Sequence, residues 1–198
     1  MANVKERLVV EQPKLLLRGD GLNKPQEDAV RVMISEMISS RFVDKREQLR
    51  GLGIYFKQTH NSGEYEMMQR MHNAAPKNVP QPLGIVVSHS VGGPVVYGYL
   101  LRYIEGDTVE YPLKEWISVL GKSVTDQIQE IFATFHAAGL AHCDPNRANA
   151  LVRRSDERVF VIDPATSRLE SWGLEYAMGY DRTVVGELIE TLSKELRM

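Results

Sequence analysis

The spacing of apolar residues changes near the middle of this chain of 198 residues. In the first half, apolar residues form short runs bounded by Gly, Pro or Asn, which is the pattern of β-strands. In the second half they recur every three or four residues over long stretches, which is the pattern of amphipathic helices. We therefore expect an α+β protein with a sheet-rich part at 1–104, which includes an N-terminal extension, and a mainly helical part at 105–198.

The first part is expected to carry helices between its strands. Val30, Ile34 and neighbouring apolar residues recur at helical spacing, which predicts a helix over about 25–40, and Asn23 stands at the position of its N-cap. A second helix is expected after Ser62, with methionines that pack in the core rather than bind a cofactor. The expected strands cover 51–58, 83–90 and 95–104.

The second part is expected to combine helices with one hairpin. A short helix at 113–120 precedes a strong helix at about 123–138, which Gly139 is placed to end. Short strands on both sides of a charged turn predict a β-hairpin over 150–163. A final helix is expected to begin near Tyr180, and its buried residues are predicted to be Val185, Leu188, Ile189, Leu192 and Leu196.

Composition narrows the classes of function. With 43% hydrophobic and 25% charged residues, the chain is typical of globular proteins. Its net charge of -2 provides no general attraction for nucleic acid or for an anionic membrane. The one cysteine, Cys143, has no partner for an internal disulfide, and no apolar run is long enough to span a membrane. We therefore expect no nucleic-acid partner, no membrane span and, by default, a cytoplasmic location.

The residues that point most directly to chemistry lie between 142 and 163. His142, Asp144 and Asn149 have the spacing H-x-D-x-x-x-x-N, and Asp163 ends an apolar strand 14 residues after Asn149. A carboxylate on a loop can take a proton from a hydroxyl group. Amide and carboxylate oxygens are ligands that Mg²⁺ prefers, and a hairpin between Asn149 and Asp163 returns both to one side. Together these features are typical of a phosphoryl-transfer site.

In these motifs the chain resembles the protein-kinase-like superfamily over about 50–198, in its minimal forms. Its length and the spacing of its catalytic segment are most similar to those of the short bacterial effector kinases delivered by type III secretion. Small atypical kinases of the RIO and lipopolysaccharide-sugar types are also similar. The resemblance implies a bilobal kinase-like fold with a truncated helical C-lobe, and it implies ATP and Mg²⁺ as cofactors.

The resemblance also implies roles for the motif residues. Asp144 is expected to orient the acceptor hydroxyl and to take its proton. Asn149 is expected to be a catalytic residue. Together with Asp163, it is also expected to hold the metal ion. His142 is expected to be structural. Asp181 matches the buried aspartate that holds the backbone of the catalytic loop in this superfamily.

A lysine and a glutamate are implied to act on the phosphates. Lys57 ends a strand similar to the one that carries the phosphate-binding lysine, and Glu64 has the position of the helix residue that pairs with that lysine. Lys45 is the alternative candidate for the phosphate-binding lysine.

A further segment is implied to bind the rest of the nucleotide. Residues 99–109 are similar to the kinase hinge, in which backbone groups of Arg102 and Ile104 are expected to bind adenine. Asp107 is the candidate for a contact with a ribose hydroxyl, and a role in the local turn is the alternative.

The chain departs from the family pattern in ways that bear on activity. No G-x-G-x-x-G precedes Lys57, so 38–42 is the candidate for a substitute phosphate loop. Cys143 stands where regulated kinases have Arg, so docking of a phosphorylated activation loop is not expected. Asp163 is followed by Pro-Ala rather than Phe-Gly, which is also similar to small-molecule kinases of the aminoglycoside and fructosamine types. Only 17 residues follow Asp181, so we expect the usual peptide-docking helices of the family to be absent.

The favoured function is that of a minimal serine/threonine protein kinase. One alternative is a small-molecule kinase that acts on a sugar or an aminoglycoside. The other is a pseudokinase scaffold that binds nucleotide or a partner without chemistry. The expected partner is a protein substrate or a small hydroxyl acceptor, with an activating or host protein as a further partner. Secretion as an effector into a host cell is the alternative to the cytoplasmic location.

Overall fold

The protein has a mixed α+β structure with two small antiparallel sheets, which confirms the expected fold class at that level. The computed structural model describes residues 14–16, 22–39, 45–90, 93–109 and 114–195. The chain divides into two compact units, each built from separate stretches of sequence. Unit 1 comprises Met1–Asn61 and Leu83–Leu100, and unit 2 comprises Ser62–Pro82 and Leu101–Met198.

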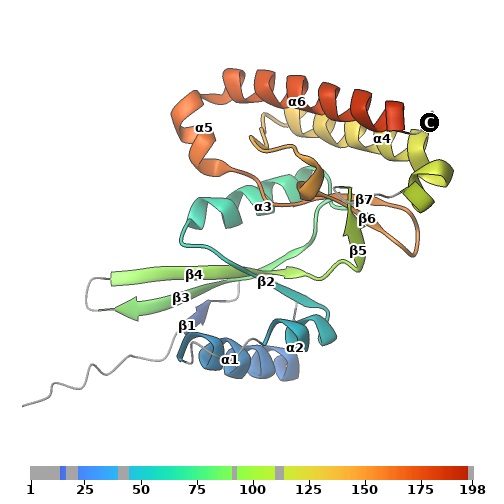
Figure 1. Ribbon diagram of the computed structural model, residues 1–198. Helices are drawn as coiled ribbons and strands as arrows, with labels where there is room; N and C mark the ends of the chain where they lie inside the picture. The colour runs from blue at the N-terminus through green and yellow to red at the C-terminus, as the bar shows by residue number, and fades with distance from the viewer. Residues whose placement is uncertain (1–13, 17–21, 40–44, 91–92, 110–113, 196–198) are drawn as a thin grey trace, which may run out of the picture. The chain divides into compact units, whose positions relative to one another are not determined.

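Figure 1 labels the elements in chain order. The strands are β1 (Lys14–Leu16), β2 (Ile54–Gln58), β3 (Pro82–Ser90), β4 (Gly93–Arg102), β5 (Gly106–Thr108), β6 (Ala150–Arg153) and β7 (Val159–Val161). The helices are α1 (Lys24–Ser39), α2 (Arg46–Gly51), α3 (Ser62–Ala74), α4 (Lys114–Ala137), α5 (Thr166–Trp172) and α6 (Leu174–Glu195), with a 3₁₀ turn η1 (Arg147–Asn149).

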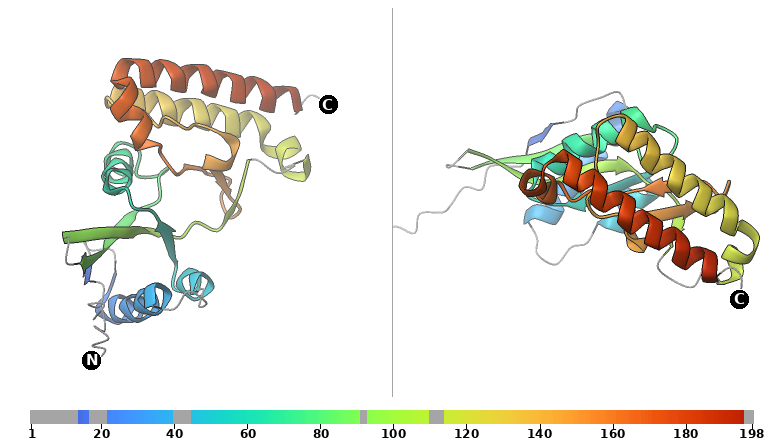
Figure 2. Two further views of the ribbon diagram at one scale, coloured as in Figure 1. Left: turned by 60° about the vertical axis from the view of Figure 1, so that its left-hand side comes forward. Right: turned by 90° about the horizontal axis from the view of Figure 1, so that it is seen from above.

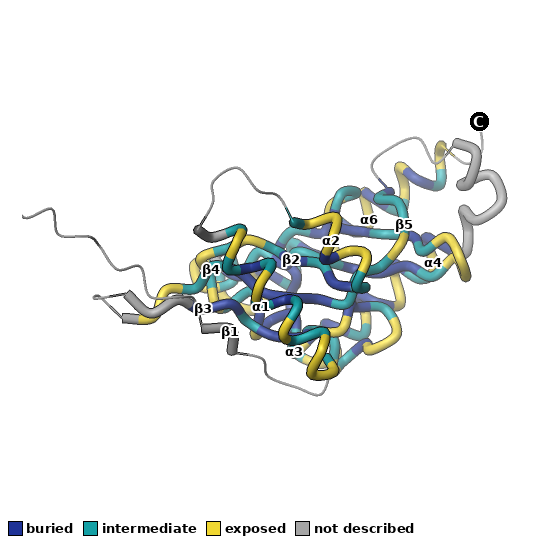
Figure 3. The backbone as a smooth tube through the Cα atoms, turned by 90° about the horizontal axis from the view of Figure 1, so that it is seen from below, coloured by how far each residue is buried: buried dark blue, intermediate teal, exposed yellow. Residues whose placement is uncertain are grey.

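Helix α1 of unit 1 begins with a reciprocal cap. Asn23 Oδ1 accepts a hydrogen bond from the Gln26 N–H at 3.0 Å, and Gln26 Oε1 accepts one from the Asn23 N–H at 3.1 Å. Two N–H groups that the helix leaves unpaired are satisfied in this way. The predicted cap at Asn23 is therefore confirmed. The helix carries both exposed and buried positions (Figure 3), and Val30 and Ile34, which are buried, stand four residues apart and so share one face.

The sheet of unit 1 has the strand order β1-β3-β4-β2. β1 pairs antiparallel with β3, with Lys14 opposite Val87 and Leu16 opposite Ile85. β2 approaches β4 so closely at Gly98 that an added Cβ atom would lie 2.2 Å from the carbonyl oxygen of Lys57. Only glycine fits there. The buried core beside the sheet is formed by Val30, Ile34, Leu49, Ile54, Phe56, Leu83, Val86 and Leu100.

Unit 2 is built on α4 and α6, which pack side by side (Figures 1 and 2). Both helices bury apolar residues at the spacing of one helical face. These are Ile128, Ile131, Phe132 and Phe135 of α4, and Ala177, Val185, Leu188 and Leu192 of α6. The methionines of α3, which are Met67, Met68 and Met71, are also buried, so their predicted role in the core is confirmed.

Helix α4 ends at the glycine that the sequence indicated. Gly139 has φ of 67°, a left-handed conformation that glycine adopts at little cost. Its N–H donates to the His136 carbonyl at 3.1 Å, and the Leu140 N–H donates to the Phe135 carbonyl at 2.9 Å. These two bonds form a Schellman motif, which satisfies carbonyls at the end of the helix.

A second sheet, in the order β5-β6-β7, lies in unit 2. β6 and β7 form the predicted hairpin, with Ala150 opposite Val161. No strand was expected at 106–108, but β5 lies there and pairs with β6. Gly106 permits this pairing, because a Cβ atom there would lie 2.4 Å from the Val152 carbonyl oxygen.

The boundary predicted at 104/105 differs from the division of the structure. The chain passes between the units at Leu100–Leu101, and α3, which was expected in the first part, belongs to unit 2. The reason is that α3 contacts α4 and α5. In addition, the Asn78 carbonyl, which follows α3, accepts a hydrogen bond from the Val161 N–H of β7 at 2.9 Å.

Several element boundaries also need correction. α2 and α5 were not predicted, the helices predicted at 113–120 and 123–138 form one helix, and α6 begins at Leu174 rather than near Tyr180. Ile189 is partly rather than fully buried, and Leu196 lies outside the described residues. Of the predicted phosphate-loop substitute, 38–39 lie in α1 and 40–42 are outside the described residues. Within the described ranges, no helix is long and apolar enough to cross a membrane.

Candidate functional site

One buried carboxylate of α6 holds the loop that follows α4. Asp181 accepts a hydrogen bond from the backbone N–H of His142 at 2.6 Å and another from that of Cys143 at 2.8 Å. Asp181 itself is 0% exposed. Cys143 has φ of 66°, a left-handed conformation that is uncommon for a residue with a side chain. The contact expected of Asp181 is therefore present, and it fixes the path of the 142–149 loop.

Within this loop, Asp144 and Asn149 are hydrogen bonded to each other. Asn149 Nδ2 donates to the backbone carbonyl of Asp144 at 2.9 Å and to its carboxylate oxygen Oδ2 at 3.0 Å. Asn146 caps η1, because its Oδ1 accepts from the N–H groups of Ala148 and Asn149. Asn149 is 9% exposed, whereas the Asp144 side chain is 33% exposed. A buried amide thus orients a carboxylate that solvent reaches.

The hairpin brings the region of Asp163 to the same place. Asn149 precedes β6 and Asp163 follows β7, so both stand at the end of the hairpin that is opposite to its turn. The Ile162 N–H donates to the Asn149 carbonyl at 3.0 Å. Asp163, the next residue, has φ of 59°, which aspartate tolerates better than most residues. The hairpin therefore returns the backbone at Asn149 and at Asp163 to one side, as expected.

The His142 ring joins the two sides of this site. Its Nε2 lies 2.7 Å from the Ile162 carbonyl, and its Nδ1 accepts from the Asp144 N–H at 3.3 Å. These partners require a neutral ring with the proton on Nε2. Burial lowers the pKa of His142, against the opposing effects of the Ile162 carbonyl and of nearby carboxylates. The expected structural role of His142 agrees with these contacts.

The Cys143 thiol is inert in this environment. Burial raises the pKa of Cys143 to about 11, with a further contribution from the Asp181 charge. The residue is 0% exposed. A thiol that stays protonated and buried is not a nucleophile.

Arg168 of α5 contacts the site, although the sequence did not single it out. Its Nη1 donates to the Cys143 carbonyl at 2.8 Å and to Asp144 Oδ1 at 3.0 Å. Its guanidinium carbon lies 5.8 Å from the centroid of the Trp172 ring. The only available signal was an arginine shortly after Asp163 in a stretch with little helical pattern. The two oxygens of Asp144 are therefore held by different residues, Oδ2 by Asn149 and Oδ1 by Arg168.

Arg102 and Ile104, the residues expected to bind adenine, lie in unit 2. The Arg102 N–H is already used, because it donates to the Gln81 carbonyl at 2.8 Å. Within the described part of the chain, no hydrogen bond involves the Ile104 N–H. The Asp107 carboxylate accepts two hydrogen bonds from Arg154, at 2.8 and 3.0 Å. This ion pair ties β5 to the end of β6, which agrees with the local structural role held open as the alternative for Asp107.

The two lysine candidates both lie in unit 1. Lys45 precedes α2, and its Nζ lies 3.1 Å from Glu36 Oε2 in an ion pair within unit 1. Lys57 is in β2 of unit 1, as expected of a strand lysine, and Glu64 lies in the first turn of α3 in unit 2. Lys45 therefore has an acidic partner of its own, other than Glu64.

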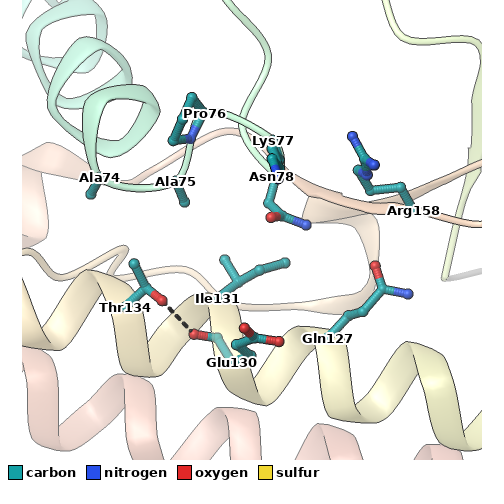
Figure 4. A pocket seen from close by; sticks show the side chains of 10 residues that line it. All are labelled: Ala74, Ala75, Pro76, Lys77, Asn78, Gln127, Glu130, Ile131, Thr134 and Arg158. Carbon is teal, nitrogen blue, oxygen red and sulfur yellow. Dashed lines mark hydrogen bonds between the residues drawn. The ribbon is translucent and has the colours of Figure 1, made fainter.

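A separate cavity of about 390 Å³ lies in unit 2 between α4 and the segment after α3 (Figure 4). Its lining includes Lys77, Glu130 and Arg158, and none of the predicted site residues. Among the residues that the structure describes, no three His, Cys, Asp or Glu side chains form a metal-binding group. The predicted pair of Asn149 and Asp163 is one amide and one carboxylate, so it is a site of a different kind and stays a prediction.

Comparison with known proteins adds no further assignment. No model of a protein family matches the chain, and no curated protein matches it significantly.

Proposed function

We propose that the protein is a minimal kinase with a bilobal, protein-kinase-like fold, which transfers the γ-phosphoryl group of ATP to a Ser or Thr hydroxyl of a protein. The observation that carries this proposal is the hydrogen-bonded loop of unit 2. In that loop Asn149 holds Asp144, and Asp181 holds the backbone on the N-terminal side of Asp144. A general base needs such a fixed orientation and access to solvent, and Asp144 has both.

In the proposed reaction, Asp144 accepts a hydrogen bond from the acceptor hydroxyl. The hydroxyl oxygen forms a bond to the γ-phosphorus, and its proton passes to the Asp144 carboxylate. The bond between the γ-phosphorus and the bridging oxygen breaks with its electron pair on that oxygen, so ADP leaves and a phosphoester remains. The residues contribute mainly by positioning and by neutralising charge.

The donor set of unit 2 fits Mg²⁺. Asn149 uses its amide nitrogen for both hydrogen bonds to Asp144. Its amide oxygen, Oδ1, is the atom that would ligate the metal ion. That oxygen makes no hydrogen bond with the described residues. Asp163 follows Ile162, whose N–H donates to the Asn149 carbonyl, and an amide oxygen and a carboxylate are ligands that suit Mg²⁺. When bound with ATP, the ion supplies positive charge against the phosphates.

Two further parts of the nucleotide need protein contacts, which are the phosphates and the adenine ring. As the resemblance implies, we propose Lys57 as the phosphate lysine and Glu64 as a further residue of the phosphate site, with Lys45 as the alternative lysine. For adenine we assign the Arg102 carbonyl and the Ile104 N–H, since the Arg102 N–H is held by Gln81.

The proposal is tested by transfer from γ-labelled ATP with Mg²⁺, to the protein itself, to a generic protein substrate and to a panel of sugars. We expect label on protein. Asp144→Asn is expected to reduce the rate about 100-fold or more, the usual contribution of a general base. Asp163→Asn is expected to abolish transfer, and both variants should unfold like the wild type. The matched control is Asp126→Asn, an exposed aspartate of α4, with an unchanged rate.

The outcomes distinguish the alternatives. Label only on a sugar would replace the protein kinase by a small-molecule kinase. Binding of ATP without transfer would indicate a pseudokinase. Wild-type labelling by Asp163→Asn would refute the metal assignment, and wild-type labelling by Asp144→Asn would refute the proposed base.

A further inference from the structure

The guanidinium group of Arg168 has one edge in use and one edge available. Nη1 makes both of its hydrogen bonds inside the site, to the Cys143 carbonyl and to Asp144 Oδ1. Within the described residues, no hydrogen bond uses Nε or Nη2. The Arg168 side chain is 42% exposed. A planar guanidinium presents Nε and Nη2 as a fork that matches the two oxygens of a carboxylate or phosphate.

The position of this fork is set by aromatic residues. The Arg168 guanidinium lies over Trp172, within the range of a cation–π contact. Trp172 packs edge to face against Tyr176 and Tyr180 of α6, at ring-centroid distances of 5.5 and 4.9 Å. An arginine held at one edge by Asp144 and below by a packed tryptophan loses little further freedom when it binds an anion. Such preorganisation favours specific recognition.

The surface around the fork is open rather than enclosed. Tyr176, which packs against Trp172, is 64% exposed, and the Asp144 side chain is 33% exposed. Small molecules are usually bound in cavities that bury most of their surface. An exposed acid beside an exposed arginine and apolar side chains is better suited to an extended peptide.

We propose that Arg168 determines substrate specificity, by binding an acidic side chain that lies within two residues of the Ser or Thr acceptor. This inference rests on the proposed function for the role of Asp144. An extended chain advances about 3.5 Å per residue. Because Arg168 and Asp144 are in direct contact, groups bound to both must lie within roughly two residues of each other. A carboxylate or a phosphoserine supplies the required pair of oxygens.

The test is a binding titration that needs no catalysis. Fluorescein-labelled peptides carry Ala in place of the acceptor Ser. In each peptide one of the four neighbouring positions, two before and two after this Ala, is changed to Asp, phosphoserine, Asn or Lys. At one of these positions we expect Asp and phosphoserine to bind wild-type protein about tenfold more tightly than Asn, by fluorescence anisotropy, and Lys to bind more weakly than Asn. The comparison of the Lys and Asn peptides needs only wild-type protein, so it tests the proposed preference for acidic residues even where a variant folds poorly.

The variants assign the effect to the fork. Arg168→Met is expected to bind the Asp and Asn peptides equally, and Arg168→Lys to retain only part of the preference, because an ammonium group is not a fork. The control is Arg158→Met, which removes an arginine of similar exposure, 39%, that lines the cavity of Figure 4. It should leave the preference unchanged.

Failure of this inference differs from failure of the proposed function. Equal binding of Asp and Asn peptides to the wild type, or no measurable binding of any peptide, overturns the inference even where phosphoryl transfer occurs. A preference that survives in Arg168→Met overturns it too. Absence of transfer together with an Arg168-dependent preference overturns the proposed function and leaves Arg168 as a binding residue for acidic peptides.

Discussion

At the scale of single residues, the energetics of the site centre on the buried carboxylate of Asp181. It accepts from two backbone N–H groups, and His136 Nε2 lies 3.5 Å from its Oδ2. A buried charge is tolerated only where its oxygens are satisfied. The native path of the 142–149 loop provides that satisfaction, so the loop and Asp181 stabilise each other.

Asp181→Asn is expected to lower the free energy of unfolding by about 2–4 kcal/mol, the range for breaking a buried hydrogen-bonded charge. The amide keeps one acceptor oxygen but turns an NH₂ group toward a backbone N–H, so one donor is left unpaired. Urea denaturation followed by circular dichroism measures the change. Asp126→Asn is the control, and a change of less than about 0.5 kcal/mol in both variants would contradict the role of Asp181.

Stability is also expected to depend on pH through His142. Its pKa is lowered in the native state by burial, from an ordinary value of 6.5. The unfolded chain therefore binds a proton that the native protein does not, as pH falls below about 6.5. The contribution of His142 is complete above that pH and decreases toward acid, with a slope of up to about 1.4 kcal/mol per pH unit for one proton.

The measurement compares urea denaturation of wild type and His142→Gln between pH 5 and 8. Glutamine retains a donor for the Ile162 carbonyl and does not titrate. The wild type is expected to lose more stability below pH 6.5 than the variant does. Since the carboxylates are common to both proteins, parallel curves would show that His142 does not titrate differently in the folded protein.

At the scale of elements, two glycines of unit 2 give opposite predictions. Gly139→Ala forces a left-handed residue at the end of α4 and is expected to cost about 1–2 kcal/mol, while Gly186→Ala lies inside α6 and is expected to stabilise by about 0.5–1 kcal/mol. An added Cβ atom has no neighbour within 4 Å at either position, so backbone preference alone decides the sign. Chemical denaturation of both variants tests this, and changes of equal sign would contradict it.

The elements that the sequence predicted well are those whose signals are local. The cap at Asn23, the stripe that includes Ile128 and Phe135, and the stop at Gly139 each depend on neighbouring residues. The elements it missed depend on partners elsewhere. β5 is only a short strand, and its extended form is fixed by pairing with β6. α5 has few residues and packs against α6.

The same distinction applies to the candidate site. The contact between Asp144 and Asn149 and the support from Asp181 follow from spacing that the motif makes visible. Arg168 was not predictable, because its contact with Asp144 depends on the path of the chain after Asp163. The division of nucleotide-binding roles between Lys57 and Glu64 remains a prediction.

At the scale of the whole molecule, the second part of the sequence, 105–198, does not contain a complete unit. Unit 2 includes Ser62–Pro82, which comes before β4 in the chain. This segment supplies the buried methionines of α3 and two hydrogen bonds from Asn78, whose Nδ2 donates to the Val159 carbonyl and whose carbonyl accepts from the Val161 N–H, both at 2.9 Å. A chain cut at the boundary that the sequence suggested therefore lacks part of the core of its own unit.

We therefore expect the fragment 105–198 to lack cooperative unfolding by circular dichroism in urea. Joining 62–82 to 101–198 through a short Gly-Ser linker should restore it, because the bond from the Arg102 N–H to the Gln81 carbonyl places the two ends close together. The control is the joined fragment with the order of residues 62–82 scrambled, which keeps composition and length but not the buried face of α3. Cooperative unfolding of 105–198 alone, or of the scrambled fragment, would show that the helices and the β5-β6-β7 sheet fold without α3, and unit 2 would then be smaller than the structure indicates.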